Sequence, residues 1–165
     1  MKRLLIFCSL FCALVIGALA AGAPPANFSG TWVLDKAKSE GLQGPMASID
    51  ITMVVTQDAK QLTTDLTYSG GPREIPPQKV TYNLDGSETT SEGPRGKATL
   101  KAKWSSDGSA LDLSSVRVAN MQGNEVTITT QDHWQLAEGG KVLKVHRKTE
   151  SPRGPQESTL VFTKK

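Results

Sequence analysis

From Ser48 onward, apolar and polar residues alternate with a period of two, which is the pattern of half-buried β-strands. Turn-forming dipeptides separate the alternating segments, and Asp85-Gly86 and Asp107-Gly108 are typical of tight hairpins. We find no segment with the period of an amphipathic helix. Together with the alternating segment Phe28–Leu34 and the polar but β-compatible segment Ser87–Glu92, the pattern therefore predicts about nine or ten short strands. The other alternating segments are 49–55, 62–68, 80–84, 98–104, 111–117, 126–136, 143–147 and 160–162.

A series of consecutive hairpins favours an all-β, antiparallel up-and-down meander. Closing this meander into a barrel of about 8–10 strands would remove the exposed sheet edges. An open sandwich of the same strands is the competing architecture. The segment from Asp35 to Pro45 contains Gly41 and Gly44, and it is expected to form a loop with one helical turn.

The chain begins with the features of a secretory signal peptide. Lys2 and Arg3 precede an apolar run, and Ala18-Leu19-Ala20 forms a small-residue cleavage site. We therefore expect residues 1–20 to be a cleaved signal, residues 21–26 a flexible leader, and residues 27–165 a single domain in the periplasm or outside the cell. Stable membrane insertion after cleavage is not expected.

Composition narrows the chemistry of the mature protein. Both cysteines, Cys8 and Cys12, lie within the expected signal, so no disulfide, thiolate metal site or cysteine nucleophile would remain. Lys2 and Arg3 also leave, so 17 of the 19 basic residues face 16 acidic ones, a net charge of +1. This balance argues against a nucleic-acid partner, and it leaves the oligomeric state open.

The segment Phe28-Ser29-Gly30-Thr31-Trp32, followed by the meander, resembles the opening strand of the lipocalin-like (calycin) superfamily. More narrowly, the chain is similar to small exported bacterial proteins of unknown function. The resemblance implies a barrel with an internal cavity. It also implies that Gly30, Trp32 and Arg147 close one end, with the arginine stacked on the tryptophan. The stretches that carry the narrower resemblance are Phe28–Trp32, Leu34–Asp35, Lys38–Ser39, Gln122–Glu125, Trp134–Leu136 and Gly139–Gly140.

Two charged residues fall on predicted inward faces. Arg117 follows Leu111 and Leu113 at period two, and Asp132 lies between Ile128 and Trp134 in the same way. They either neutralise each other, or Arg117 presents its guanidinium to an anionic ligand. A bulge near Ser114-Ser115 would instead turn Arg117 to water. The inward aromatic residues either fill the core or line a pocket. The candidate ligand-binding residues are Tyr68, Tyr82, Trp104, Arg117, Asp132 and Trp134.

No catalytic constellation or cofactor motif is found. His133 and His146 are the only histidines, both alternate onto outward faces, and their spacing matches no zinc motif, so no metal site is predicted. We therefore expect a non-enzymatic, exported protein that binds a small apolar or amphipathic molecule, which could carry an anionic group, without a cofactor. The alternative is an interaction module, such as an inhibitor of an exported hydrolase. A weaker third hypothesis is an enzyme that uses Asp132 with Arg117 or Arg147.

Overall fold

The structure is a computed structural model that describes residues 24–71, 74–93, 96–121 and 123–165. In these residues ten antiparallel strands form one sheet, accompanied by two short 3-10 turns, η1 (Gly44–Ala47) and η2 (Glu138–Gly140). The expected signal peptide and leader residues 21–23 lie outside the described residues. The strands are β1 (Gly30–Leu34), β2 (Asp50–Gln57), β3 (Gln61–Ser69), β4 (Gln78–Asn83), β5 (Thr89–Gly93), β6 (Gly96–Trp104), β7 (Ala110–Met121), β8 (Asn124–Ala137), β9 (Val142–Glu150) and β10 (Gln156–Lys164).

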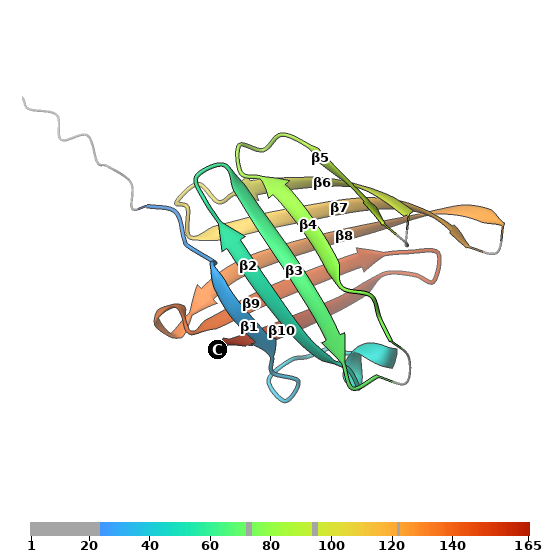
Figure 1. Ribbon diagram of the computed structural model, residues 1–165, viewed down its shortest axis with the longest axis horizontal. Coiled ribbons are helices and arrows are strands. Elements are labelled where there is room, and N and C mark those ends of the chain that lie inside the picture. The colour runs from blue at the N-terminus through green and yellow to red at the C-terminus, as the bar shows by residue number, and fades with distance from the viewer. Residues whose placement is uncertain (1–23, 72–73, 94–95, 122) are drawn as a thin grey trace, which may run out of the picture.

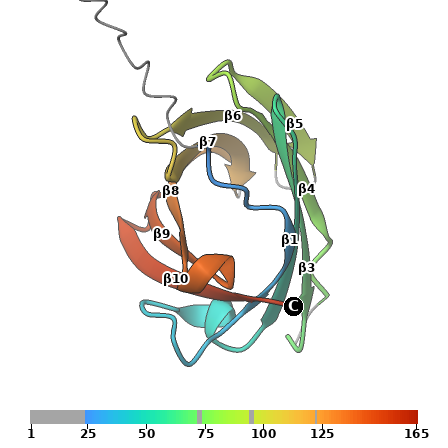
Figure 2. The same ribbon diagram turned by 90° about the vertical axis from the view of Figure 1, so that its left-hand side faces the viewer.

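The strands follow the chain as an up-and-down meander that curls into a nearly closed barrel (Figure 1). Each strand pairs with its neighbours in sequence except at β4 and β5, and β1 also pairs with β10. Viewed from the side of Figure 1, the strands surround a common interior (Figure 2). The all-β, lipocalin-like barrel predicted from the alternation is thus confirmed.

The barrel is not closed by strand pairing between β4 and β5. These two strands are the ends of the sheet order and share no ladder. A side-chain hydrogen bond connects them, from Thr89 Oγ1 to the Thr81 carbonyl oxygen at 2.7 Å. The missing β4–β5 ladder is explained by the polar segment before and within β5, because this segment offers few apolar side chains to bury at that edge.

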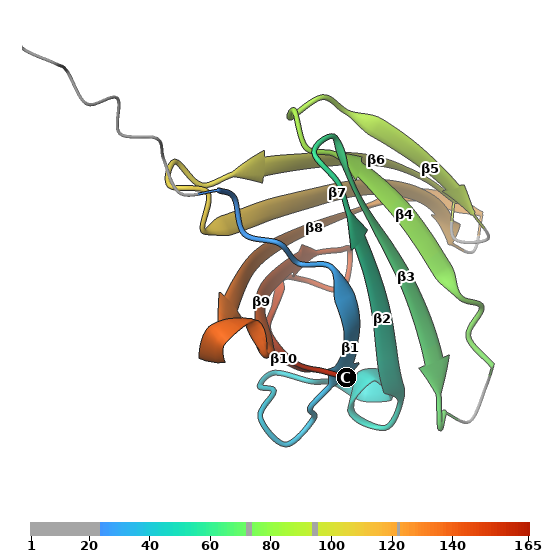
Figure 3. The ribbon, with the colours of Figure 1, turned by 60° about the vertical axis from the view of Figure 1, so that its left-hand side comes forward.

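The N-terminal segment covers one end of the barrel. Ala26 donates its backbone N–H to Gly108 O (2.9 Å) and accepts a hydrogen bond from Gln57 Nε2 (2.9 Å). Phe28 is fully buried behind it and packs against Trp104 and Trp134, at ring-centroid distances of 6.1 and 5.6 Å. The segment enters β1 across the barrel end (Figure 3). Ala26 was predicted to end a flexible leader, but both of its backbone groups are bonded.

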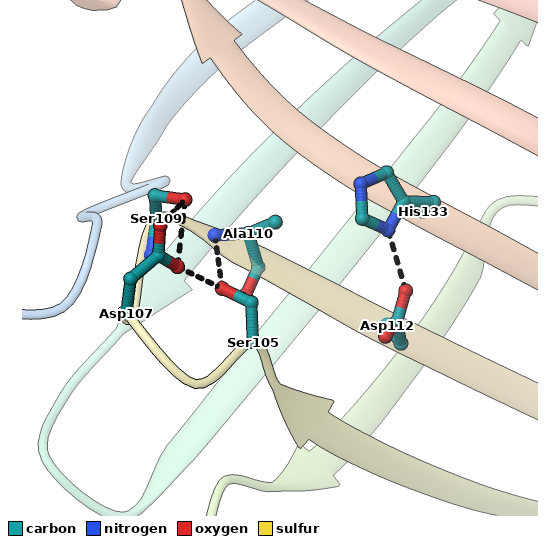
Figure 4. A network of polar contacts seen from close by, with 6 residues as sticks. All are labelled: Ser105, Asp107, Ser109, Ala110, Asp112 and His133. Carbon is teal, nitrogen blue, oxygen red and sulfur yellow. Dashed lines mark hydrogen bonds and ion pairs between the residues drawn. The ribbon is translucent and has the colours of Figure 1, made fainter.

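The β6–β7 turn that receives Ala26 is itself braced by side chains (Figure 4). Ser105 Oγ and Ser109 Oγ both donate to Asp107 Oδ1, at 2.6 and 2.9 Å, and Ala110 N–H donates to Ser105 Oγ at 2.9 Å. The hydrogen bonds that Asp107 accepts from Ser105 and Ser109 lower its pKa to about 2, and the bond from Ser105 has the largest effect. The turn therefore offers a fixed carbonyl, that of Gly108, to hold the N-terminal segment.

Trp32 closes the same end, but its cationic partner differs from the one predicted. The ring is fully buried, Nε1 donates to Phe28 O at 2.9 Å, and Lys164 Nζ lies 5.1 Å from the ring centroid. Lys164 is directly opposite Trp32 in the β1–β10 ladder, whereas Arg147 is bound to Asp132. The predicted Trp32–Arg147 stack is therefore wrong, because the pairing of β1 with β10 brings Lys164 to the ring.

The glycine of the Gly-x-Trp segment makes room for this lysine. A Cβ at Gly30 would lie 2.5 Å from Lys164 Cε, and the backbone there has a φ of +146°, which favours glycine. Gly30 and Trp32 thus lie together at the same end of the barrel, with Lys164 beside both.

Candidate functional site

A cavity of about 830 Å³ occupies the barrel interior away from the covered end. This volume is in the range of pockets that hold one small molecule. It is lined by residues from the eight consecutive strands β2 to β9. The lining residues are Met53, Thr64, Leu66, Tyr68, Gln78, Val80, Tyr82, Gly93, Gly96, Leu100, Leu113, Ser115, Arg117, Ala119, Asn120, Ile128, Thr130, Asp132, Trp134 and Arg147.

The register of β7 and β8 shows how far Arg117 and Asp132 lie from each other along the barrel. Arg117 is opposite Ile128, towards the end of the strands that carries the β7–β8 turn. Asp132 is opposite Leu113, four residues further along β7, or roughly 13 Å at 3.3 Å per residue. Two residues further along β8 lies Trp134, next to the buried Phe28. The cavity therefore has one cation near its outer end and the other charged groups deeper.

The deeper charges neutralise each other. Arg147 Nε donates to Asp132 Oδ1 at 2.7 Å and Arg147 Nη2 donates to Oδ2 at 2.6 Å, a bidentate pair between directly opposite residues of β8 and β9. Burial acts to lower the pKa of Arg147, but the charge and hydrogen bonds of Asp132 outweigh it, so the pKa of the guanidinium is raised above its ordinary value. The side chains are 33% and 11% exposed for Arg147 and Asp132. The pair is thus a polar patch in the cavity wall.

Arg117 has no ion-pair or hydrogen-bond partner among the described residues. The β6–β7 and β7–β8 ladders run without a break through Ser114 and Ser115, so the alternative of a bulge is excluded. Val116 and Val118 face water at 41% and 39% exposure, and Arg117 faces inward. The three charged lining residues, Arg117, Asp132 and Arg147, sum to one positive charge. An unpaired cation that is partly removed from water favours an anionic partner.

Tyr82 also lines the main cavity and is 8% exposed. Burial, and secondarily the Asp132 carboxylate, raise the pKa of its phenol to about 12. The protein thus keeps the ring neutral at any physiological pH, and Tyr82 contributes an aromatic wall to the cavity.

This pKa predicts how stability depends on alkaline pH. The unfolded chain loses the Tyr82 proton near pH 10 and the folded chain only near 12. The contribution of Tyr82 is therefore complete below pH 10 and is lost as the pH rises to 12, amounting to about 2–3 kcal/mol at 1.36 kcal/mol per pKa unit. We expect ultraviolet titration of a Tyr68→Phe variant to show ionisation near 12 in the folded protein. Ionisation near 10 in folded protein would contradict the buried environment.

A second cavity of about 340 Å³ shares part of the wall and is more apolar. It extends from Tyr68 and Arg147 towards η1 and β10. Its additional lining consists of side chains that carry almost no polar groups. These residues are Met46, Ile49, Ile51, Ile75, Val145, Leu160 and Phe162. Together the two spaces offer a charged region at one side and an apolar region at the other.

Five of the six predicted ligand-binding residues line the main cavity: Tyr68, Tyr82, Arg117, Asp132 and Trp134. Trp104 is not among the lining residues, and it stacks on Phe28 at the covered end instead. Its inward face was correctly predicted, but alternation carries no information on height along the barrel.

Other lining residues were not among the predicted ligand-binding residues. Arg147 was assigned to barrel closure, yet it lies in the wall of both cavities. Thr64, Ser115 and Thr130 also line the main cavity. These three residues could have been predicted from the sequence, because they are polar residues at inward positions of alternating segments. Trp134 Nε1 is buried without a hydrogen-bond partner in the described structure, so a donor lies close to the cavity wall.

Comparison with known proteins shows the fold and not a family. The structure is similar to that of the zebrafish ileal bile acid-binding protein in complex with cholic acid, with a TM-score of 0.57, 13% identity, and coverage of 84% of this chain and 98% of that one. It is equally similar to an abundant heat soluble (SAHS) protein from Ramazzottius varieornatus, with a TM-score of 0.57, 13% identity, and coverage of 83% and 94%. No protein-family model matches the chain, and no curated protein does.

The lipocalin-like resemblance is thus supported at the level of the barrel, while the narrower likeness to exported bacterial proteins stays a prediction. Within the part of the chain that the structure describes, no helix is long and apolar enough to cross a membrane.

Proposed function

We propose that this protein binds one small amphipathic molecule inside its barrel, with an anionic group at Arg117 and an apolar part in the second, more apolar cavity. The observation that carries the proposal is the cavity of about 830 Å³ with an unpaired arginine in its wall. The bile acid-binding protein, which has a similar fold, was solved with cholic acid, and this supports a small-molecule ligand.

The amphipathic character of the ligand follows from the distribution of polarity. The neutral Asp132–Arg147 pair attracts neither sign of charge strongly, so Arg117 dominates the field felt by an entering molecule. The second cavity, walled by residues such as Ile49, Val145 and Phe162, suits a hydrocarbon part. A molecule that reaches from one region to the other would satisfy both.

We further propose that binding takes place without chemical conversion. Asp132 is the one carboxylate in the cavity wall as described, and both of its oxygens accept hydrogen bonds from Arg147. A carboxylate held in this way is a poor general base or nucleophile, because the guanidinium stabilises its charged form. The interaction-module alternative would be favoured by a filled barrel, and the size of the cavity argues for a small molecule.

The signal-like sequence of residues 1–20 is the basis for placing the protein in the periplasm or outside the cell. In that compartment a barrel of this kind would hold a poorly soluble molecule away from water. Detection of the mature chain, starting after Ala20, in an exported fraction of its host would support this placement.

If the ligand binds inside the barrel, tryptophan substitutions at two adjacent residues should have very different effects on ligand affinity. Ser115 lines the cavity, whereas Ser114 is on the outer face of the same strand. An environment-sensitive fluorescent fatty acid is expected to bind the parent with micromolar affinity or better. Ser115→Trp fills the cavity and should weaken binding at least about tenfold, a change of 1.4 kcal/mol. Ser114→Trp is the matched control and should bind like the parent.

The measurement is a fluorescence titration of the three proteins, each checked for an intact thermal transition. Equal binding by Ser115→Trp and Ser114→Trp would place the probe outside the barrel. No binding by the parent across several chain lengths and head groups would favour the interaction module.

A further inference from the structure

The outer wall of the barrel carries a row of polar residues that the ligand cavity does not use. Asp112, His133, His146 and Thr159 occupy directly opposite positions on β7, β8, β9 and β10. Their neighbours along the strands, Asp132 and Arg147 among them, face the interior. The two histidines are thus cross-strand partners on the outer face, where the Cβ atoms of such pairs are roughly 4.5–5.5 Å apart.

Each histidine is held by its Nδ1 atom on the side away from the other. His133 Nδ1 is 2.6 Å from Asp112 Oδ1 on β7, and the contact is drawn in Figure 4. His146 Nδ1 is 3.1 Å from Thr159 Oγ1 on β10. Because the Nδ1 atom of each ring is engaged in this way, the Nε2 atoms of both histidines are left for another ligand.

This is the arrangement in which histidines bind metal ions. A ligating histidine uses one nitrogen for the metal and hydrogen-bonds the other to a carboxylate or similar group, which fixes the tautomer and the orientation of the ring. Both side chains are accessible, His133 being 40% exposed. We propose that His133 and His146 form a surface site for a divalent transition-metal ion, with Nε2 of each as ligand and water in the remaining positions.

The donor set indicates which ion binds best. Imidazole nitrogen suits Cu²⁺, Ni²⁺ and Zn²⁺, and affinity in this series is highest for Cu²⁺. No group of three histidine, cysteine or acidic side chains in the described residues is arranged to hold a metal, so a closed tetrahedral zinc site is not offered. Two nitrogens and open water positions fit the tetragonal preference of Cu²⁺.

The surrounding charges limit the affinity without abolishing it. Lys144 and Lys148 flank His146 on the same strand face. Lys148 is paired with Glu157 at 3.1 Å, and Asp112 adds a negative charge beside His133. Asp112 is therefore a positioning residue that also favours the dication, and we expect micromolar binding of Cu²⁺.

The test is a Cu²⁺ titration of the mature protein by calorimetry in a weakly coordinating buffer, with electron paramagnetic resonance of the complex. The parent should bind one ion at the site with two nitrogen ligands resolved in the spectrum. His133→Asn and His146→Asn should each weaken binding at least about tenfold, and Asp112→Asn should weaken it about 10–100-fold, the range for a partner that orients a ligand. The double variant His133→Asn/His146→Asn reports any binding by the chain terminus.

Thermal melts without metal should be equal for all variants, because the side chains lie on the surface. Parent-like affinity in the double variant would overturn the proposal. So would loss in one single variant only, which would mean that one histidine binds alone. Both results are independent of ligand binding in the cavity.

Discussion

Replacing Trp32 with alanine is expected to lower the free energy of unfolding by about 3–5 kcal/mol, the range for deleting a large buried aromatic side chain. The ring is fully buried at the covered end, and its loss would also leave Phe28 O without the hydrogen bond from Nε1. Denaturant titration measures the change. Trp32→Phe is the matched control, and it should cost much less because most of the packing is kept.

The partner of Trp32 can be tested in the same series. Because Lys164 Nζ lies 5.1 Å from the ring centroid, Trp32→Phe and Lys164→Ala should be non-additive. Trp32→Phe and Arg147→Met should be additive, since Arg147 is paired with Asp132. An unchanged midpoint for Trp32→Ala would contradict the role of Trp32 in closing the barrel.

Replacing Asp132 with alanine is expected to cost about 3 kcal/mol, because it leaves the Arg147 guanidinium unpaired inside the barrel. The effect should fall at the lower end of the range for buried pairs, since water in the cavity reaches Arg147. Adding Arg147→Met should recover much of the loss, because two apolar side chains replace a desolvated ion pair.

Arg117→Met provides the matched control for this pair. Arg117 has no protein partner in the described structure, so its removal should change the melting temperature little. Adding Arg117→Met to Asp132→Ala should bring no rescue. Rescue by Arg117→Met instead of Arg147→Met would show that Asp132 pairs with the other arginine.

These pairings show where sequence-based prediction ends. Alternation was sufficient to place Arg117 and Asp132 inside, and the continuous ladders confirm both faces. It could not choose the partner of Asp132, because that depends on register between strands. The β8–β9 register puts Arg147 directly opposite Asp132, whereas Arg117 is opposite Ile128.

The sequence pattern also could not predict which strands close the barrel or how far along the barrel each inward side chain lies. Lys164 meets Trp32 only because β10 returns to pair with β1, a contact between the two ends of the domain. Trp104 faces inward as expected, but it lies at the level of Phe28 and not in the cavity. The pairing of the histidines on the outer wall follows from the same register and has no signal in a single strand.

If an anionic group of the ligand contacts Arg117, the protein should distinguish two ligands that differ only in the charge of the head group. Dodecanoate and 1-dodecanol share a hydrocarbon chain and differ in charge, so displacement of a fluorescent probe by each compares the head groups alone. The parent should prefer dodecanoate at least about tenfold, because a hydrogen bond to a charged group contributes about 1.5–3 kcal/mol.

Arg117→Met should remove this preference, while Lys97→Met, which deletes an exposed cation on the neighbouring strand β6, should keep it. Equal affinity of the parent for the two ligands, or a preference that survives in Arg117→Met, would show that Arg117 does not bind an anionic group of the ligand.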